Sequence, residues 1–118
     1  MPNAMEIRIE VSHCDTSSPQ GLLDAAAATS LARVFKALSD PTRVRLLRYL
    51  AVSPGGTVCA CHLPDALGIS QPTLSFHLHK LADVGLVDRH QRGRWAHWSV
   101  NNEALEPVRA FLSLDPQA

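Results

Sequence analysis

The sequence lacks the features of a membrane or secreted protein. Its 118 residues include no run of about 18 apolar residues, and the N-terminus MPNAMEIRIEV has neither the apolar stretch nor the small-residue cleavage site of a signal peptide. We therefore expect a cytoplasmic protein with no membrane partner. Hydrophobic residues make up 46% and charged residues 19%, which is typical of one folded domain.

The chain also has no net charge, so its composition alone does not indicate a nucleic-acid partner. Its charges are unevenly placed, however. Residues 33–94 carry nine Lys or Arg against four Asp, a local net charge of +5. A basic segment within a neutral chain attracts phosphates, because a polyanion responds to the local field. From charge alone, an ordinary solvated face is an equally good interpretation.

Cysteines are few. An odd count of three in a cytosolic chain argues against a disulfide framework. Cys59 and Cys61 lie one residue apart, and Cys14 lies near the N-terminus. Free thiols in that compartment are buried small side chains, metal ligands or reactive groups.

The apolar pattern divides the chain into three parts. We expect an N-terminal arm over residues 1–20 that carries Cys14, a folded domain over 21–113, and a tail over 114–118. Helical spacing predicts helices over 22–38, 41–52, 63–67, 71–84 and 103–112. Strands flanking Arg92-Gly93 predict a hairpin before the last helix. The expected fold is mainly α with a small β-hairpin, a winged helix-turn-helix.

Local signals refine these elements. Asp40 and Ser70 are expected N-caps, either Asn101 or Asn102 caps the last helix, and Gly68 suits the left-handed end of the third helix. The expected inward-facing side chains are Val44, Leu46, Leu47, Leu50, Leu74, Leu78, Leu81, Leu105, Val108, Phe111 and Leu112.

Residues 63–81 have the order helix, tight turn, helix, which is typical of a DNA-reading motif. The second helix places leucines on one side and short polar side chains on the other, as a helix in the major groove requires. An ordinary amphipathic helix is the alternative, but the Arg-rich hairpin that follows favours DNA. The expected DNA contacts are Ser70, Gln71, Thr73, Ser75, Phe76, His79, Lys80, Arg92 and Arg94.

Three segments, FKALSDPTRVRLLRYL, CACHLPDALGISQPTLSFHLHKLADVGLV and RGRWAHWSV, resemble the ArsR/SmtB family of winged-helix, metal-sensing bacterial repressors. The resemblance covers residues 30–112. It implies a homodimer, built from the first and last helices, that binds a partly palindromic operator and releases it when an inducer binds. Ala25 to Ala28, Leu31 and Phe111 are the expected dimer-face residues, although a monomer core is a competing use for them.

Soft-metal sensors of that family carry C-V-C-D-L before the motif, and residues 59–63, CACHL, are similar. Pro64 stands where several arsenite sensors have a third cysteine, so the third ligand must come from elsewhere, and Cys14 is the remaining thiol. Three thiolates suit As(III) or Sb(III). A fourth ligand from His13 or His62 leaves Zn(II), Cd(II) or Pb(II) as alternatives.

The spacing of the two cysteines also predicts their backbone. On a helix, residues i and i+2 point about 200° apart, whereas in a strand they share a face. We therefore expect residues 57–61 to be extended or irregular, with the helix starting near His62. Two buried small side chains are the alternative. His97, Asn102 and Glu103 lack the family's second metal-site pattern, so we interpret them as structural.

Three other functions compete with metal-triggered release. A thiol redox switch is one, in which Cys59 and Cys61 oxidise together with Cys14. A metal-buffering protein would bind the ion but ignore specific DNA. A thiol enzyme would use either cysteine with His62, His77 or His79 as base, but nothing in the chain suggests an oxyanion hole or an orienting acid.

Overall fold

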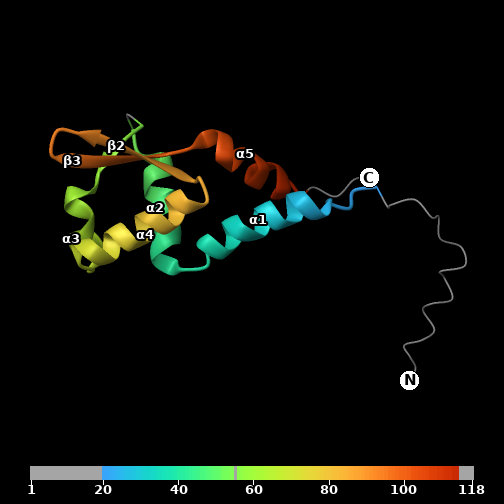
Figure 1. Ribbon diagram of the computed structural model, residues 1–118, viewed down its shortest axis with the longest axis horizontal. Helices are drawn as coiled ribbons and strands as arrows, with labels where there is room; N and C mark the ends of the chain where they lie inside the picture. The colour runs from blue at the N-terminus through green and yellow to red at the C-terminus, as the bar shows by residue number, and fades with distance from the viewer. Residues whose placement is uncertain (1–19, 55, 115–118) are drawn as a thin grey trace, which may run out of the picture.

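The computed structural model describes residues 20–54 and 56–114 (Figure 1). Its helices are α1 (Ala25–Ala37), α2 (Pro41–Val52), α3 (Leu63–Leu67), α4 (Gln71–Asp83) and α5 (Asn102–Phe111). Its strands are β1 (Val58–Cys59), β2 (Val87–Arg92) and β3 (Trp95–Val100), and a 3-10 turn, η2 (Ala60–His62), links β1 to α3. The predicted fold class, a mainly α winged helix-turn-helix, is confirmed. The predicted N-terminal arm, with Cys14 and His13, lies outside the described residues.

Side chains cap the N-termini of α1, α2, α4 and α5. Asp40 accepts backbone N–H groups from Thr42 and Arg43, and the Ser70 hydroxyl accepts from the Thr73 N–H, so both predicted caps are confirmed. Of the two candidate caps for α5, Asn101 is the one used, and the helix continues through Pro107.

Leucines from α2 and α4 form the centre of the core. Leu74, Leu78 and Leu81 are fully buried, as predicted, and pack with Leu46 and Leu50. The prediction for Val44 was wrong: its side chain is 50% exposed. The buried face of α2 runs through residues 46 and 50, and a residue two positions before 46 points about 200° away from it.

Two predicted inward-facing residues of α5 are also exposed. Leu105 and Val108 are buried as expected, but Phe111 is 40% exposed and Leu112, the C-cap, is 58% exposed. The core of this chain therefore does not extend to the C-terminal end of α5.

The sheet has three strands in the order β1-β3-β2, all antiparallel. The prediction of a two-stranded wing was therefore incomplete, because β1 pairs Val58 with Trp98 and Cys59 with His97. The hairpin turn also lies one residue later than expected. β2 continues through Arg92, and Gly93, with φ +63°, adopts the left-handed conformation that the turn requires.

Figure 1 shows how the elements divide the molecule. α2, α3, α4 and the sheet form one body, while α1 and α5 run beside each other away from it. The rings of Phe35 and Phe111 join the two helices, with their centroids 5.5 Å apart. Within the described residues, no helix has the length and apolar character needed to cross a membrane.

Candidate DNA-binding surface and thiol site

The outward side of α4 carries most of the predicted DNA contacts. Gln71, Phe76, His79 and Lys80 are exposed, whereas the three leucines of the same helix are buried. The Lys80 ammonium lies 5.3 Å from the centroid of the Phe76 ring, which presents an aromatic side chain and a positive charge together. The helix therefore offers both hydrogen-bonding and apolar groups to a groove.

The other three predicted residues of this helix are already engaged within the protein. The Ser70 hydroxyl donates to the Thr73 hydroxyl, 2.9 Å away, while capping the helix. Ser75 is half-buried, and its carbonyl oxygen lies 2.8 Å from Nδ1 of His79. These contacts fix the N-terminal turn of α4 and orient the His79 ring.

The wing extends the same surface. Arg92 and Arg94 are exposed at the hairpin end, as a phosphate-contacting role requires. Between α4 and the sheet lies a hollow of about 340 Å³, lined by Gln71 and His79 on one side and Arg89 on the other. Our prediction from sequence missed Arg89. No local pattern marks Arg89, because its place follows from the strand register: it pairs with Trp98, whose ring meets His79 of α4.

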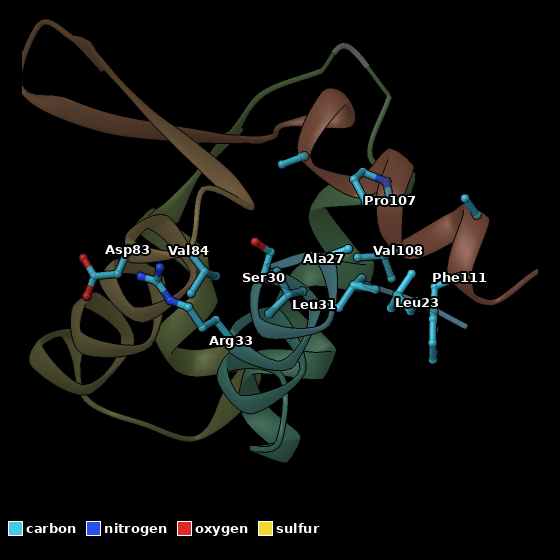
Figure 2. Close-up of a pocket in the computed structure, with 13 residues that line it drawn as sticks. Leu23, Ala27, Ser30, Leu31, Arg33, Asp83, Val84, Pro107, Val108 and Phe111 are labelled. Atoms are coloured by element: carbon cyan, nitrogen blue, oxygen red, sulfur yellow. The ribbon is translucent and has the colours of Figure 1, made fainter. Parts of the chain in front are cut away.

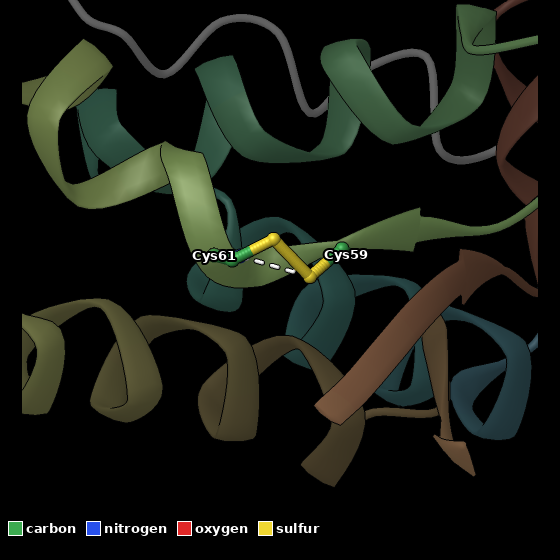
Figure 3. Close-up of a disulfide and its surroundings, with 2 residues drawn as sticks. All are labelled: Cys59 and Cys61. Atoms are coloured by element: carbon green, nitrogen blue, oxygen red, sulfur yellow. Dashed lines mark hydrogen bonds between the residues drawn. A yellow bond between two sulfur atoms is a disulfide. The ribbon is translucent and has the colours of Figure 1, made fainter. Parts of the chain in front are cut away.

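The two neighbouring cysteines meet just before α3. The backbone is extended at Cys59 and turns into η2 at Ala60, which brings the sulfur atoms of Cys59 and Cys61 into contact as a disulfide (Figure 3). The Cys61 N–H also donates to the Cys59 sulfur at 3.3 Å. The prediction of an extended or irregular backbone over 57–61 is correct for 57–59 but wrong for 60–61, which lie in the tight turn η2 that brings the two side chains together. The predicted helix start near His62 agrees with α3, which begins at Leu63.

The same bridge corrects the expectation of free thiols at this spot. It joins cysteines separated by one residue, so it is a local link and not a framework that holds distant elements together. Cys59 and His62 line a hollow of about 790 Å³ between α2, β1 and α3, with Arg45 and Arg48 on its α2 side. The thiol site therefore adjoins a cationic surface.

A second surface lies between α1 and α5. A cavity of about 700 Å³ is lined by Leu23, Ala27 and Leu31 from the α1 side and by Val108 and Phe111 from α5 (Figure 2). Leu31 is buried, but Phe111 and Leu23 stay 40% and 45% exposed. Such an exposed apolar face is typical of an association surface.

Known proteins share this arrangement. A helix-turn-helix domain model matches residues 38–90. An arsenic resistance transcriptional regulator of Pseudomonas putida is 37% identical over 79 residues, 67% of this chain and 60% of that protein. The arsenical resistance operon repressor of Staphylococcus xylosus is 36% identical over 71% of this chain and 78% of that protein. A cadmium resistance regulatory protein homolog of Staphylococcus aureus is 33% identical over 70% and 68%.

Solved structures agree. An ArsR-like transcriptional regulator from Rhodococcus has a TM-score of 0.65 at 29% identity, covering 76% of this chain and 80% of that one. A homodimeric winged helix-turn-helix DNA-binding domain from Mycobacterium bovis, a possible ArsR-family regulator, has a TM-score of 0.59 at 26% identity, covering 86% and 97%. The chain belongs to the ArsR family. The resemblance inferred from its motifs is confirmed, and family members are DNA-binding regulators, which rules against the thiol enzyme.

The residues of this ArsR-family chain can be tested against a soft metal ion. Cys59 and Cys61 offer two adjacent sulfurs, as one shared ion requires. Within residues 20–54 and 56–114, no three His, Cys, Asp or Glu side chains form a ready metal site. On the strand facing Cys59, however, Nδ1 of His97 is buried and has no hydrogen-bond partner among the described residues. Once the bridge is reduced, the chemistry of the two thiols and of this imidazole nitrogen suits a thiophilic ion.

Proposed function

We propose that this chain is a cytoplasmic, homodimeric repressor that binds a partly palindromic operator and releases it when As(III) or Sb(III) binds cysteine thiolates. Cys59, Cys61 and Cys14 are the proposed ligands. The observation that carries the proposal is the contact between Cys59 and Cys61 directly before the helix-turn-helix. Two relatives support it, one named as an arsenic resistance transcriptional regulator and the other as an arsenical resistance operon repressor.

The proposed DNA surface consists of the outward side of α4 and the tip of the wing. Its residues are Ser70, Gln71, Thr73, Ser75, Phe76, His79, Lys80, Arg92 and Arg94. Their exposure or their place in the first turns of α4 supports this role. A dimer joined through the α1 and α5 face presents two such surfaces, one for each half of the operator.

Release follows from the position of the thiols. η2 leads directly into α3, and α3 leads through Gly68 into α4. An ion that holds Cys59 and Cys61 in a geometry different from that of the DNA-bound form favours a conformation that fits the operator less well. Couplings of this kind are about 1 to 3 kcal/mol, or roughly 5- to 150-fold in affinity.

The experiment is an operator titration. Duplex selected from random DNA is titrated with reduced wild type and with Cys14→Ser, Cys59→Ser and Cys61→Ser, each with and without As(III), Sb(III), Cd(II), Pb(II) or Zn(II). We expect As(III) and Sb(III) to weaken operator binding by the wild type within the range above, and to have no effect on operator binding by each variant. A full response in all three variants places the inducer site elsewhere. Selective release by Cd(II), Pb(II) or Zn(II) favours the divalent alternative, with His13 or His62 as an extra ligand.

The Cys59–Cys61 bridge itself favours a second candidate, a redox-controlled repressor. Two thiols lose two electrons and two protons to a peroxide, which is reduced to water and an alcohol or to two waters. If oxidation sets operator affinity, metal-free peroxide releases the DNA and a dithiol reductant restores binding. Retained binding by fully bridged protein eliminates this candidate.

A further inference from the structure

We infer that His97 is a metal ligand of the thiol site, so that Cys59, Cys61 and His97 together hold a divalent thiophilic ion such as Cd(II). This inference rests on the proposed function, because it names a ligand of the same site. It replaces our interpretation of His97 as structural.

The strand register carries the first step. Cys59 on β1 and His97 on β3 are direct partners in an antiparallel pair, so their side chains leave the sheet on the same face. Directly opposed residues have Cβ atoms about 5 Å apart. Zinc sites of the same donor types have metal–sulfur distances of about 2.3 Å and metal–nitrogen distances of about 2.1 Å. An ion shared by the two side chains would be bound by the imidazole through Nδ1, the ring nitrogen nearer to its Cβ.

The second step is the state of that nitrogen. Nδ1 of His97 is buried and has no hydrogen-bond partner among the described residues. A buried polar atom left unpaired costs free energy, and coordination to an ion would remove that cost. His90, the partner of His97 on the next strand, differs in this respect: its Nε2 lies 2.8 Å from the Ser99 hydroxyl. Of the two facing histidines, His97 is the one with a buried ring nitrogen that lacks a partner among the described residues.

The third step concerns the sulfurs. In the bridged form Cys59 and Cys61 are bonded to each other and cannot both bind an ion as thiolates. Reduction frees both sulfurs to bind an ion as thiolates, and Cys59 is the strand partner of His97. Two thiolates and an imidazole match the ligand preference of Cd(II) and Zn(II), whereas As(III) prefers thiolates alone. His97 would thus admit divalent ions to a site whose As(III) affinity depends on sulfur.

The test uses the full reduced chain with 15N-labelled histidine. Cd(II) is added to wild type, to His97→Gln and to the matched control His90→Gln, while thiolate-to-Cd(II) absorption reports affinity and 15N NMR reports each imidazole. We expect the His97 Nδ1 resonance to shift in wild type, His97→Gln to bind Cd(II) at least about tenfold more weakly, and His90→Gln to match wild type. As(III) affinity should be the same in all three.

Two results overturn the inference: an unshifted His97 resonance in wild type, or equal losses in His97→Gln and His90→Gln. The NMR arm does not depend on the folding of a variant. The proposed function fails separately. If Cd(II) shifts His97 but neither Cd(II) nor As(III) weakens operator binding, the ligand assignment stands and the repressor mechanism does not. If the ions release the operator and the His97 resonance stays unshifted, the repressor mechanism stands and the assignment of His97 as a ligand does not.

Discussion

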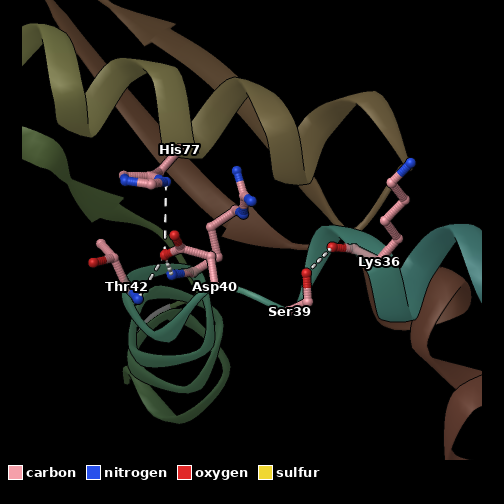
Figure 4. A network of polar contacts seen from close by, with 6 residues as sticks. Lys36, Ser39, Asp40, Thr42 and His77 are labelled. Atoms are coloured by element: carbon pink, nitrogen blue, oxygen red, sulfur yellow. Dashed lines mark hydrogen bonds and ion pairs between the residues drawn. The ribbon is translucent and has the colours of Figure 1, made fainter.

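Nδ1 of His77, on α4, lies 4.0 Å from Oδ1 of Asp40, the N-cap of α2 (Figure 4). The same carboxylate oxygen accepts the Thr42 N–H at 2.8 Å and the Arg43 N–H at 3.3 Å. His77 is only 12% exposed and lies on the side of α4 that faces α2. One carboxylate thus caps the second helix and contacts the helix proposed to read DNA.

This contact predicts a loss of stability in acid. Burial raises the pKa of Asp40, but the backbone hydrogen bonds from Arg43 and Thr42 and the electrostatic interactions with His77 and Arg43 outweigh it, so the pKa lies below its ordinary value of 3.8. A lowered folded pKa means that the stabilisation is present above 3.8 and is lost as the pH falls through the folded value. We expect the thermal midpoint of wild type to fall more steeply below pH 3.8 than that of Asp40→Asn, which keeps a capping acceptor but does not titrate. Circular dichroism melts from pH 7 downward measure this. Equal slopes contradict it.

Arg94, at the tip of the wing, is expected to affect the salt dependence of DNA binding but not the preference for particular base sequences. If Arg94 contacts a phosphate, Arg94→Ala should weaken binding to all duplexes alike and reduce the slope of log affinity against log salt by about 0.9. Arg109→Ala is the matched control, because Arg109 lies on α5 and pairs with Glu106 at 2.9 Å. Titrations at several salt concentrations give the slopes. An unchanged slope for Arg94→Ala would remove the wing tip from the phosphate contacts.

Gln71, in contrast to Arg94, is expected to affect the preference for particular base sequences. It is exposed in the first turn of α4, and its amide suits paired hydrogen bonds to an adenine. Gln71→Ala should cost about 1 to 3 kcal/mol on the selected operator and relax the base preference at one position of each half-site. Competition between operator and single-substituted duplexes measures the preference. A loss that is the same for every duplex would make Gln71 a phosphate contact.

Local chemistry was predictable from sequence, and long-range pairing was not. Asp40, Ser70 and Gly68 act on their own or adjacent turns, so their roles followed from a few neighbouring residues. β1 is only two residues long and exists because β3 lies beside it, which no local pattern records. His97 lies opposite Cys59 because of the same pairing between β1 and β3.

The candidate site divides in the same way. The exposed side of α4 followed from helical spacing, because buried leucines fix where the remaining side chains point. Arg89 was missed because its place beside α4 depends on how the sheet packs. The turn at Ala60, which joins the two cysteines, also differs from the extended backbone that their spacing predicted.

The α1 and α5 face predicts the oligomeric state. Phe111 packs on Phe35 yet stays 40% exposed beside the cavity between these helices. We expect such exposure in a single subunit if a second subunit covers the residue in the dimer. Burying a carboxylate in this apolar face costs free energy, so Phe111→Glu should weaken the dimer by about 2 kcal/mol or more, roughly 30-fold. Val44→Glu is the control, since Val44 is 50% exposed on α2, away from this face. Sedimentation equilibrium measures both. If Phe111→Glu and Val44→Glu dimerise like wild type, the subunits meet elsewhere; if only Phe111→Glu dissociates, its operator affinity should fall with it, because each half-site is then bound alone.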